Sequence, residues 1–291
     1  MAQGRISLSG KAGGRYDFIS SKEMPAARPS GMTETIVSGL MPELADQWLM
    51  ESIERRRALI QQVTDLHRNR IARFVDQLFD EESDECDTMV DAMIAECGDP
   101  QKVVERLFDP AARVIGDNWC ADECDFVKVT IAMSRIQRLF RRLTSEHPPV
   151  AAPDMTRCAL LTPAPGEQHM FGLCVVEDAF RRSGWEVDCC DCDEAAKMFR
   201  LVASNSYRII GVSVSADRHL PDLVSIVRKL RSKSRNKSVV LMAGGSLVMQ
   251  NPQGAVNAGF DLLAVDASSA VALAEAVVTS KTIANERLAA E

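Results

Sequence analysis

Residues 157–172 read RCALLTPAPGEQHMFG, an apolar run followed by a loop and the start of a helix. The short apolar stretch 157–162, ended by Pro163, is typical of a buried strand. Pro163, Pro165 and Gly166 exclude regular structure from the loop, and the pattern over residues 172–183 predicts a helix. A strand, a loop and a helix in this order begin a βαβ unit.

Four further apolar runs follow, separated from one another by helical patterns. The predicted strands are residues 185–190, 208–214, 238–242 and 262–265. The predicted helices are residues 194–203, 220–231, 253–258 and 268–278. This alternation predicts the α/β fold class, with a Rossmann-like, doubly wound, five-stranded parallel sheet domain over residues 156–291. Ligands of such sheets bind beyond the carboxyl ends of the strands.

The chain before this domain has a helical period. Three helices are predicted at residues 43–78, 84–96 and 101–116, and a fourth carries a stripe expected to be buried: Phe126, Val129, Met133, Ile136 and Phe140. Four helices with short connections predict an N-terminal four-helix bundle cap over residues 41–146. The proline-rich residues 147–155 are expected to be a linker. Residues 1–40 have no sustained period and are expected to be a disordered extension.

The net charge of the 291-residue chain is −7. This charge argues against a protein that coats nucleic acid electrostatically, and the sequence contains no direct DNA-binding module. No apolar run is long enough to span a membrane. Nine cysteines without a secretory signal favour free thiols in a reducing compartment. The sequence therefore predicts a cytoplasmic protein with no membrane association.

Three loops at the predicted carboxyl edge of the sheet carry residues suited to binding a cofactor. The first contains Glu167 and His169, a carboxylate that can hold one nitrogen of an imidazole while the other binds a metal. Ser213 lies near the end of the strand at 208–214 and Ser215 follows this strand, and both offer small hydroxyl groups. The strand at 238–242 leads into Gly244-Gly245, which removes side chains where a bulky group would meet the backbone.

The spacing of these loops resembles the cobalamin-binding fingerprint, which reads Asp-x-His-x-x-Gly, then Ser-x-Leu, then Gly-Gly. The matching residues here are Glu167, His169 and Gly172, then Ser213 and Ser215, then Gly244 and Gly245. Forty residues separate Gly172 from Ser213, and 28 separate Ser215 from Gly244.

The resemblance implies that His169 is the metal ligand and replaces the cofactor's own benzimidazole base on the lower side of cobalt. The displaced nucleotide tail is then expected in a slot lined by Ser213 and Gly244-Gly245. The other cofactor-binding candidates of these loops are Glu167, Gln168, Met170, Gly172 and Ser215. Glu167 stands where many members have Asp. Ser215 stands where Leu is usual, which is expected to leave the slot less apolar.

The helical half resembles the cap of cobalamin light sensors of the CarH type and of methyltransferases, whose Gly-x-x-Trp turn covers the upper face of the corrin. Gly116 and Trp119 match that turn, but Val129-Thr130 replaces the Glu-His pair that follows it. The resulting pattern, which includes Phe126, is similar to the AerR/PpaA group of photosynthesis antirepressors and to the related haem-binding sensor domains. Trp119, Phe126 and Thr130 are accordingly expected on the upper side of the cofactor.

This resemblance implies a non-enzymatic, light-responsive regulator that binds hydroxo- or adenosylcobalamin. Its expected partner is a transcriptional repressor of the PpsR/CrtJ type. Two alternatives stay open: a corrinoid carrier that shuttles methyl groups in a methyltransferase system, and a haem-binding redox sensor with His169 as axial ligand. The serine and glycine slot favours cobalamin over haem, because haem has no nucleotide tail to bury.

Overall fold

The computed structural model describes residues 54, 65–80, 84–190, 195–215 and 219–289, with side chains of the last range described as far as residue 279. The predicted extension over residues 1–40, and most of the predicted helix over 43–78, lie outside these residues. The described residues belong to one compact unit.

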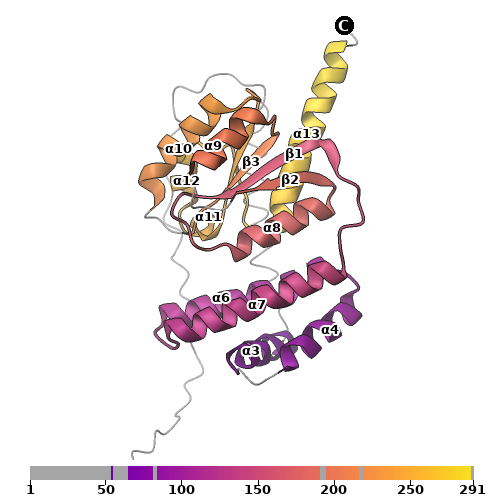
Figure 1. The fold of residues 1–291 in the computed structure, drawn as a ribbon, viewed down its shortest axis with the longest axis vertical. Helices are drawn as coiled ribbons and strands as arrows, with labels where there is room; N and C mark the ends of the chain where they lie inside the picture. The colour runs from indigo at the N-terminus through magenta and orange to yellow at the C-terminus, as the bar shows by residue number, and fades with distance from the viewer. Residues whose placement is uncertain (1–53, 55–64, 81–83, 191–194, 216–218, 290–291) are drawn as a thin grey trace, which may run out of the picture. The chain divides into compact units, whose positions relative to one another are not determined.

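The helical part contains a core of buried apolar side chains contributed by every one of its described helices. Its elements are α3 (Asp65–Phe79), α4 (Glu85–Cys97), α5 (Pro100–Val103), the π-helical turn η1 (Val104–Phe108), α6 (Asp109–Cys120) and α7 (Phe126–Glu146) (Figure 1). The predicted helix at 101–116 is thus divided by a π turn. Asp125 caps α7, because its carboxylate accepts the Lys128 N–H at 2.8 Å.

The second part is built on a sheet of five parallel strands, as the sequence predicts. The strands are β1 (Asp154–Pro163), β2 (Trp185–Cys189), β3 (Ile209–Ser213), β4 (Val240–Gly244) and β5 (Leu262–Leu263). Their order is β2-β1-β3-β4-β5, so the direction of winding reverses between β1 and β3. The loops after these two strands therefore lie at the switch point, where ligands of doubly wound sheets bind.

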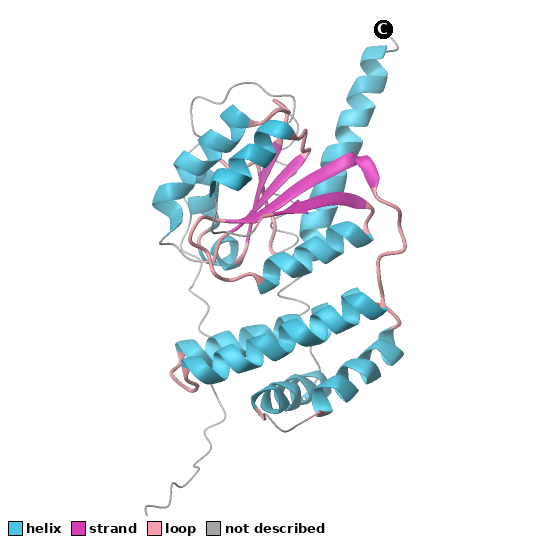
Figure 2. Cartoon of the chain, viewed as in Figure 1, coloured by secondary structure: helices cyan, strands magenta, loops and turns pink. Residues whose placement is uncertain are grey.

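Helices cover both faces of the sheet (Figure 2). One face packs against α8 (Phe171–Arg182) and α13 (Ala267–Ala289). The other packs against α9 (Ala195–Ser204), α10 (Leu220–Lys233), α12 (Pro252–Ala258) and the short, unpredicted α11 (Ser246–Gln250).

Helix α8 also packs against the helical part. The ring of Phe171 meets that of Phe140 on α7 edge-on, with centroids 5.7 Å apart. Val175 and Ala179, one and two turns further along α8, are buried in the same core. The helix that begins directly after the His169 loop is therefore in contact with both halves of the chain.

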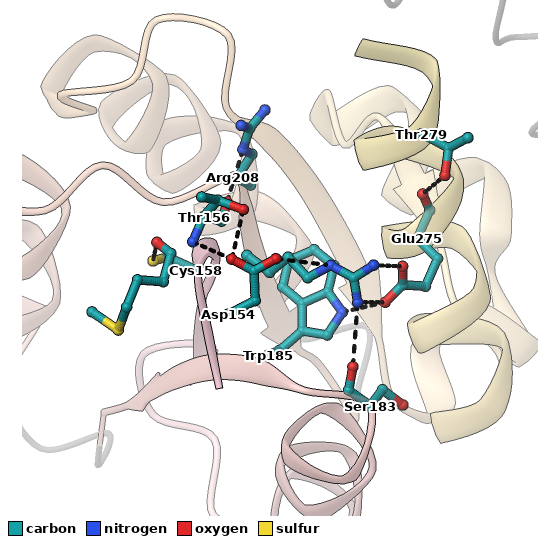
Figure 3. Close-up of polar contacts among 10 residues, drawn as sticks. Asp154, Thr156, Cys158, Ser183, Trp185, Arg208, Glu275 and Thr279 are labelled. Carbon is teal, nitrogen blue, oxygen red and sulfur yellow. Dashed lines mark hydrogen bonds and ion pairs between the residues drawn. The ribbon is translucent and has the colours of Figure 1, made fainter. Parts of the chain in front are cut away.

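At the amino-terminal end of the sheet, a polar cluster joins β1, β2 and α13 (Figure 3). The buried Trp185 donates its Nε1–H to Glu275 at 2.7 Å, and Arg157 pairs with the same carboxylate at 2.9 Å. Through Glu275, this cluster ties a later turn of α13 to the end of the sheet that is opposite to the three loops.

Among the residues that the structure describes, no helix is long and apolar enough to cross a membrane.

Candidate functional site

The loop after β1 brings Glu167 and His169 into direct contact. The Nδ1 atom of His169 lies 2.6 Å from Oε1 of Glu167, and the same oxygen accepts the N–H groups of Gln168 and His169 at 2.9 Å. The Glu167 side chain is fully buried, whereas 62% of the His169 side chain is exposed. The longer side chain of glutamate therefore still reaches the imidazole.

The charge of Glu167 decides which nitrogen of His169 is available. Burial raises the pKa of Glu167, but the hydrogen bonds from His169 and Ser215 outweigh it and lower the pKa to about 2. The ionised carboxylate can only accept hydrogen bonds, so the proton of the neutral imidazole sits on Nδ1. Nε2 then keeps its lone pair, which is the requirement for binding a metal ion.

Hydrogen bonds hold the three predicted loops in register. The N–H of Ser215 donates to Oε2 of Glu167 at 2.7 Å, so the carboxylate spans the first and second loops. The second and third loops are joined by Val214 N–H to the Gly244 carbonyl at 2.9 Å, and by the Ser246 hydroxyl to the Ser215 carbonyl at 2.6 Å. The three loops that the sequence spacing singles out therefore lie next to one another in the structure.

A cavity of about 160 Å³ lies between these loops, the sheet and helices α8 and α13. The predicted residues Gly172, Ser213, Gly244 and Gly245 line it. Most of the remaining lining comes from apolar side chains such as Leu161 and Met242. A dry cavity of roughly 150 Å³ accepts one benzene-sized ring, so the volume and the apolar lining suit part of a flat aromatic group.

Glycine is required at one position beside this cavity. Gly245 has φ +91°, and a Cβ atom there would lie 2.4 Å from the Val214 carbonyl oxygen. A Cβ on Gly211 would lie 2.7 Å from Cδ2 of Leu161, which is the end of a flexible side chain and can shift. A side chain at Gly244 would make only an ordinary contact at 3.8 Å. Gly245 thus keeps the turn close to β3, whereas Gly244 keeps the cavity open.

Other predicted loop residues have different surroundings. Ser215 is not among the residues that line this cavity, and its N–H donates to Glu167. Gln168 is exposed and contacts Glu167 through its backbone N–H. Met170 is partly buried beside the core between the sheet and α8.

The predicted upper-face residues lie at the turn between α6 and α7 and are exposed. Trp119, in the last turn of α6, is 46% exposed, and Phe126, the first residue of α7, is 70% exposed. The expectation that Phe126 belongs to the core is therefore wrong, because it precedes the part of α7 that other helices cover. The Thr130 hydroxyl donates to the Phe126 carbonyl. None of the three lines the cavity.

Three functional candidates were not predicted. Asp109 and Arg113 of α6 line the cavity, although they belong to the helical part. They follow the π turn η1, and π turns are frequent at functional sites. His219 precedes α10, and its buried Nε2 lies 3.8 Å from Oε2 of Glu167. Nothing in the local sequence around these residues distinguishes them from surface positions.

Comparison with known proteins agrees with this geometry. Two family profiles, each described as a B12 binding domain, match residues 157–274 and residues 56–144. A 20.5 kDa protein in the bchF-crtJ intergenic region of Rhodobacter capsulatus is 29% identical over 173 residues, which cover 58% of this chain and 88% of that relative. The monomethylamine corrinoid protein of Methanosarcina barkeri matches the fold with a TM-score of 0.59 at 14% identity, over 71% of this chain and 97% of that protein.

The two matched regions together cover the helical part and the α/β part, in the order that the sequence predicts. The fold match extends over both parts. The chain thus carries two regions that match B12 binding domains, with Glu167 in contact with His169 in the second of them, and it is a cobalamin-binding protein.

Proposed function

We propose that this protein is a cobalamin-dependent, light-responsive antirepressor that binds a transcriptional repressor of photosynthesis and tetrapyrrole genes, of the PpsR/CrtJ type. The observation that carries this proposal is the relative from Rhodobacter capsulatus, which lies between bchF and crtJ. Because this relative is encoded beside crtJ, we take a repressor of that type as the partner of the present chain.

The contacts of the helical part supply a route by which cofactor state reaches a surface. Asp109 and Arg113 line the cavity, and the hydroxyl of Ser268 at the start of α13 donates to Glu105 of η1 at 2.7 Å. A change in the group that occupies the cavity would therefore alter the contacts of η1 and α6. Helix α6 ends at the exposed Trp119, beside the turn that leads to Phe126.

Cobalamin supplies a corrin that absorbs visible light and a light-sensitive upper ligand on cobalt, present as hydroxo- or adenosylcobalamin. In this proposal His169 holds the lower side, and Trp119, Phe126 and Thr130 stand on the upper side. The two states of the upper side differ in their affinity for the repressor, because a ligand shifts an equilibrium only through differential affinity.

The test is the affinity of the full-length, cobalamin-loaded protein for a repressor of this type, measured in the dark and after illumination. A light-dependent change of at least several-fold, lost in His169→Ala, supports the proposal. Equal affinities in light and dark, with cobalamin bound in both, contradict it.

A corrinoid methyl carrier is a second candidate, favoured by the likeness in fold to the monomethylamine corrinoid protein. Transfer of a methyl group from a methylated donor to the reduced, loaded protein would support it. The haem alternative is addressed by the same preparation: binding of haem with no uptake of cobalamin would support a haem sensor. The apolar cavity beside Ser213 and Gly244-Gly245 favours cobalamin.

A further inference from the structure

A second imidazole lies behind the carboxylate that holds His169. The side chain of His219 is 11% exposed, and its Nε2 atom is buried without a hydrogen-bond partner among the residues that the structure describes. This nitrogen lies 3.8 Å from Oε2 of Glu167. A buried polar nitrogen is rarely left without a partner, so this one calls for an explanation.

The surroundings of His219 direct its ring at Glu167. The residue lies directly before α10, at its N-cap position. Gly166, in the first loop, passes over the ring with φ +81°, and a Cβ there would lie 3.8 Å from Cε1 of His219. The turn that carries Glu167 therefore passes close to the imidazole, and the positive φ at Gly166 favours glycine in that turn.

Both oxygens of the Glu167 carboxylate accept hydrogen bonds. Oε1 accepts from two backbone N–H groups and from Nδ1 of His169. Oε2 accepts the Ser215 N–H at 2.7 Å. His219 is on the side of Oε2, where a donor in addition to Ser215 would help to fix the plane of the carboxylate and therefore the direction of the His169 ring.

We propose that His219 is a positioning residue for the lower cobalt ligand, and that its Nε2–H donates to Oε2 of Glu167 when His169 binds cobalt. Closing the gap from 3.8 Å to hydrogen-bond length needs a shift of about 1 Å or less. Binding of a metal ion at Nε2 of His169 strengthens the donation from Nδ1 to Oε1. The hydrogen bond at Oε2 then holds the carboxylate against the pull on its other oxygen. This inference rests on cobalamin binding at His169.

The test uses the full-length protein and cobinamide, a corrinoid without the nucleotide tail and its base. Cobinamide has no base of its own, so an axial nitrogen on its cobalt must come from the protein. The affinity of the protein for cobinamide therefore reports on the lower ligand, without a contribution from a tail in the cavity. His219→Leu keeps much of the volume of the ring and removes the N–H group. His219→Gln places an amide N–H near the position of Nε2. His147→Leu, at the end of α7, is the matched control.

The expected result is a loss of roughly tenfold in cobinamide affinity for His219→Leu, as for other residues that orient a metal ligand. The axial nitrogen signal in the spectrum of the Co(II) form should weaken in the same variant. His219→Gln should restore both, and His147→Leu should change neither. If the leucine variant does not fold, His219→Asn, whose amide is too short to reach Oε2, takes its place.

Two results would overturn the proposal while leaving cobalamin binding intact. One is wild-type affinity and signal in His219→Leu. The other is a glutamine variant as weak as the leucine variant. Failure of the wild-type protein to bind any corrinoid would instead overturn the assignment of the cofactor, and the positioning role with it.

Discussion

Replacing Glu167 with glutamine should destabilise the protein even without a cofactor. The amide oxygen of glutamine can accept from the donors now on Oε1, but its NH₂ group would then face the Ser215 N–H, donor against donor. The Glu167 pKa, lowered from an ordinary 4.5 to about 2, corresponds to about 3 kcal/mol in favour of the ionised form. Glu167→Gln should therefore lower the free energy of unfolding by about 3 kcal/mol, or Tm by about 6–12 °C.

The pH dependence has a defined sign. Because the folded state lowers the pKa of Glu167, its contribution is complete above about pH 4.5 and is lost as the pH falls towards about 2. The stability difference between wild type and Glu167→Gln should shrink by more than half between about pH 7 and about pH 3. Urea denaturation of both apo proteins, followed by circular dichroism, measures this difference.

The control is Glu146→Gln, which removes an exposed ion pair with Arg142 at 3.6 Å. Exposed pairs contribute little, so this change should cost less than about 1 kcal/mol. Equal stability of Glu167→Gln and wild type at neutral pH would refute the account of Glu167 as a buried, ionised acceptor. So would a difference that stays constant with pH.

Three further predictions concern the turn after β4 and the opposite end of the sheet. Gly245→Ala, with a Cβ 2.4 Å from the Val214 carbonyl oxygen, should lower the stability of the apo protein by more than about 2 kcal/mol, whereas Gly244→Ala should unfold like wild type. Gly244→Ala should instead weaken cobalamin more than cobinamide, because only the former places a tail in the cavity; equal weakening of both would contradict this role. Trp185→Phe leaves Glu275 without the indole N–H and should cost about 1–2 kcal/mol in thermal unfolding, with cobalamin affinity unchanged.

The elements that the sequence predicts well are those determined by local pattern. The five strands are short apolar runs between helical patterns, so their positions agree with the structure to within a few residues. The carboxyl ends of parallel strands meet at one edge of a sheet. For this reason the sequence could predict that Ser213 and Gly244 lie side by side next to the loop that carries Glu167 and His169.

What the sequence does not predict depends on contacts between distant segments. The periodicity of α7 identifies one face of the helix but not how far its neighbours extend, so Phe126 is exposed although Ile136 and Phe140 on the same stripe are buried. Arg113 lines the cavity only because α6 packs near the sheet, and no local pattern reports that contact. His219 has an ordinary sequence context, and its significance comes from the position of Glu167, 52 residues earlier.

The central claim is that His169, and not the cofactor's own base, is the lower ligand of cobalt. The most direct measurement is the electron paramagnetic resonance spectrum of the cob(II)alamin-loaded protein, made with ¹⁵N-labelled histidine and unlabelled cofactor. The account predicts that the axial nitrogen splitting is a doublet from ¹⁵N, and that it disappears in His169→Ala. A triplet from ¹⁴N in the labelled wild-type protein would show that the benzimidazole base remains on cobalt, and would contradict the account.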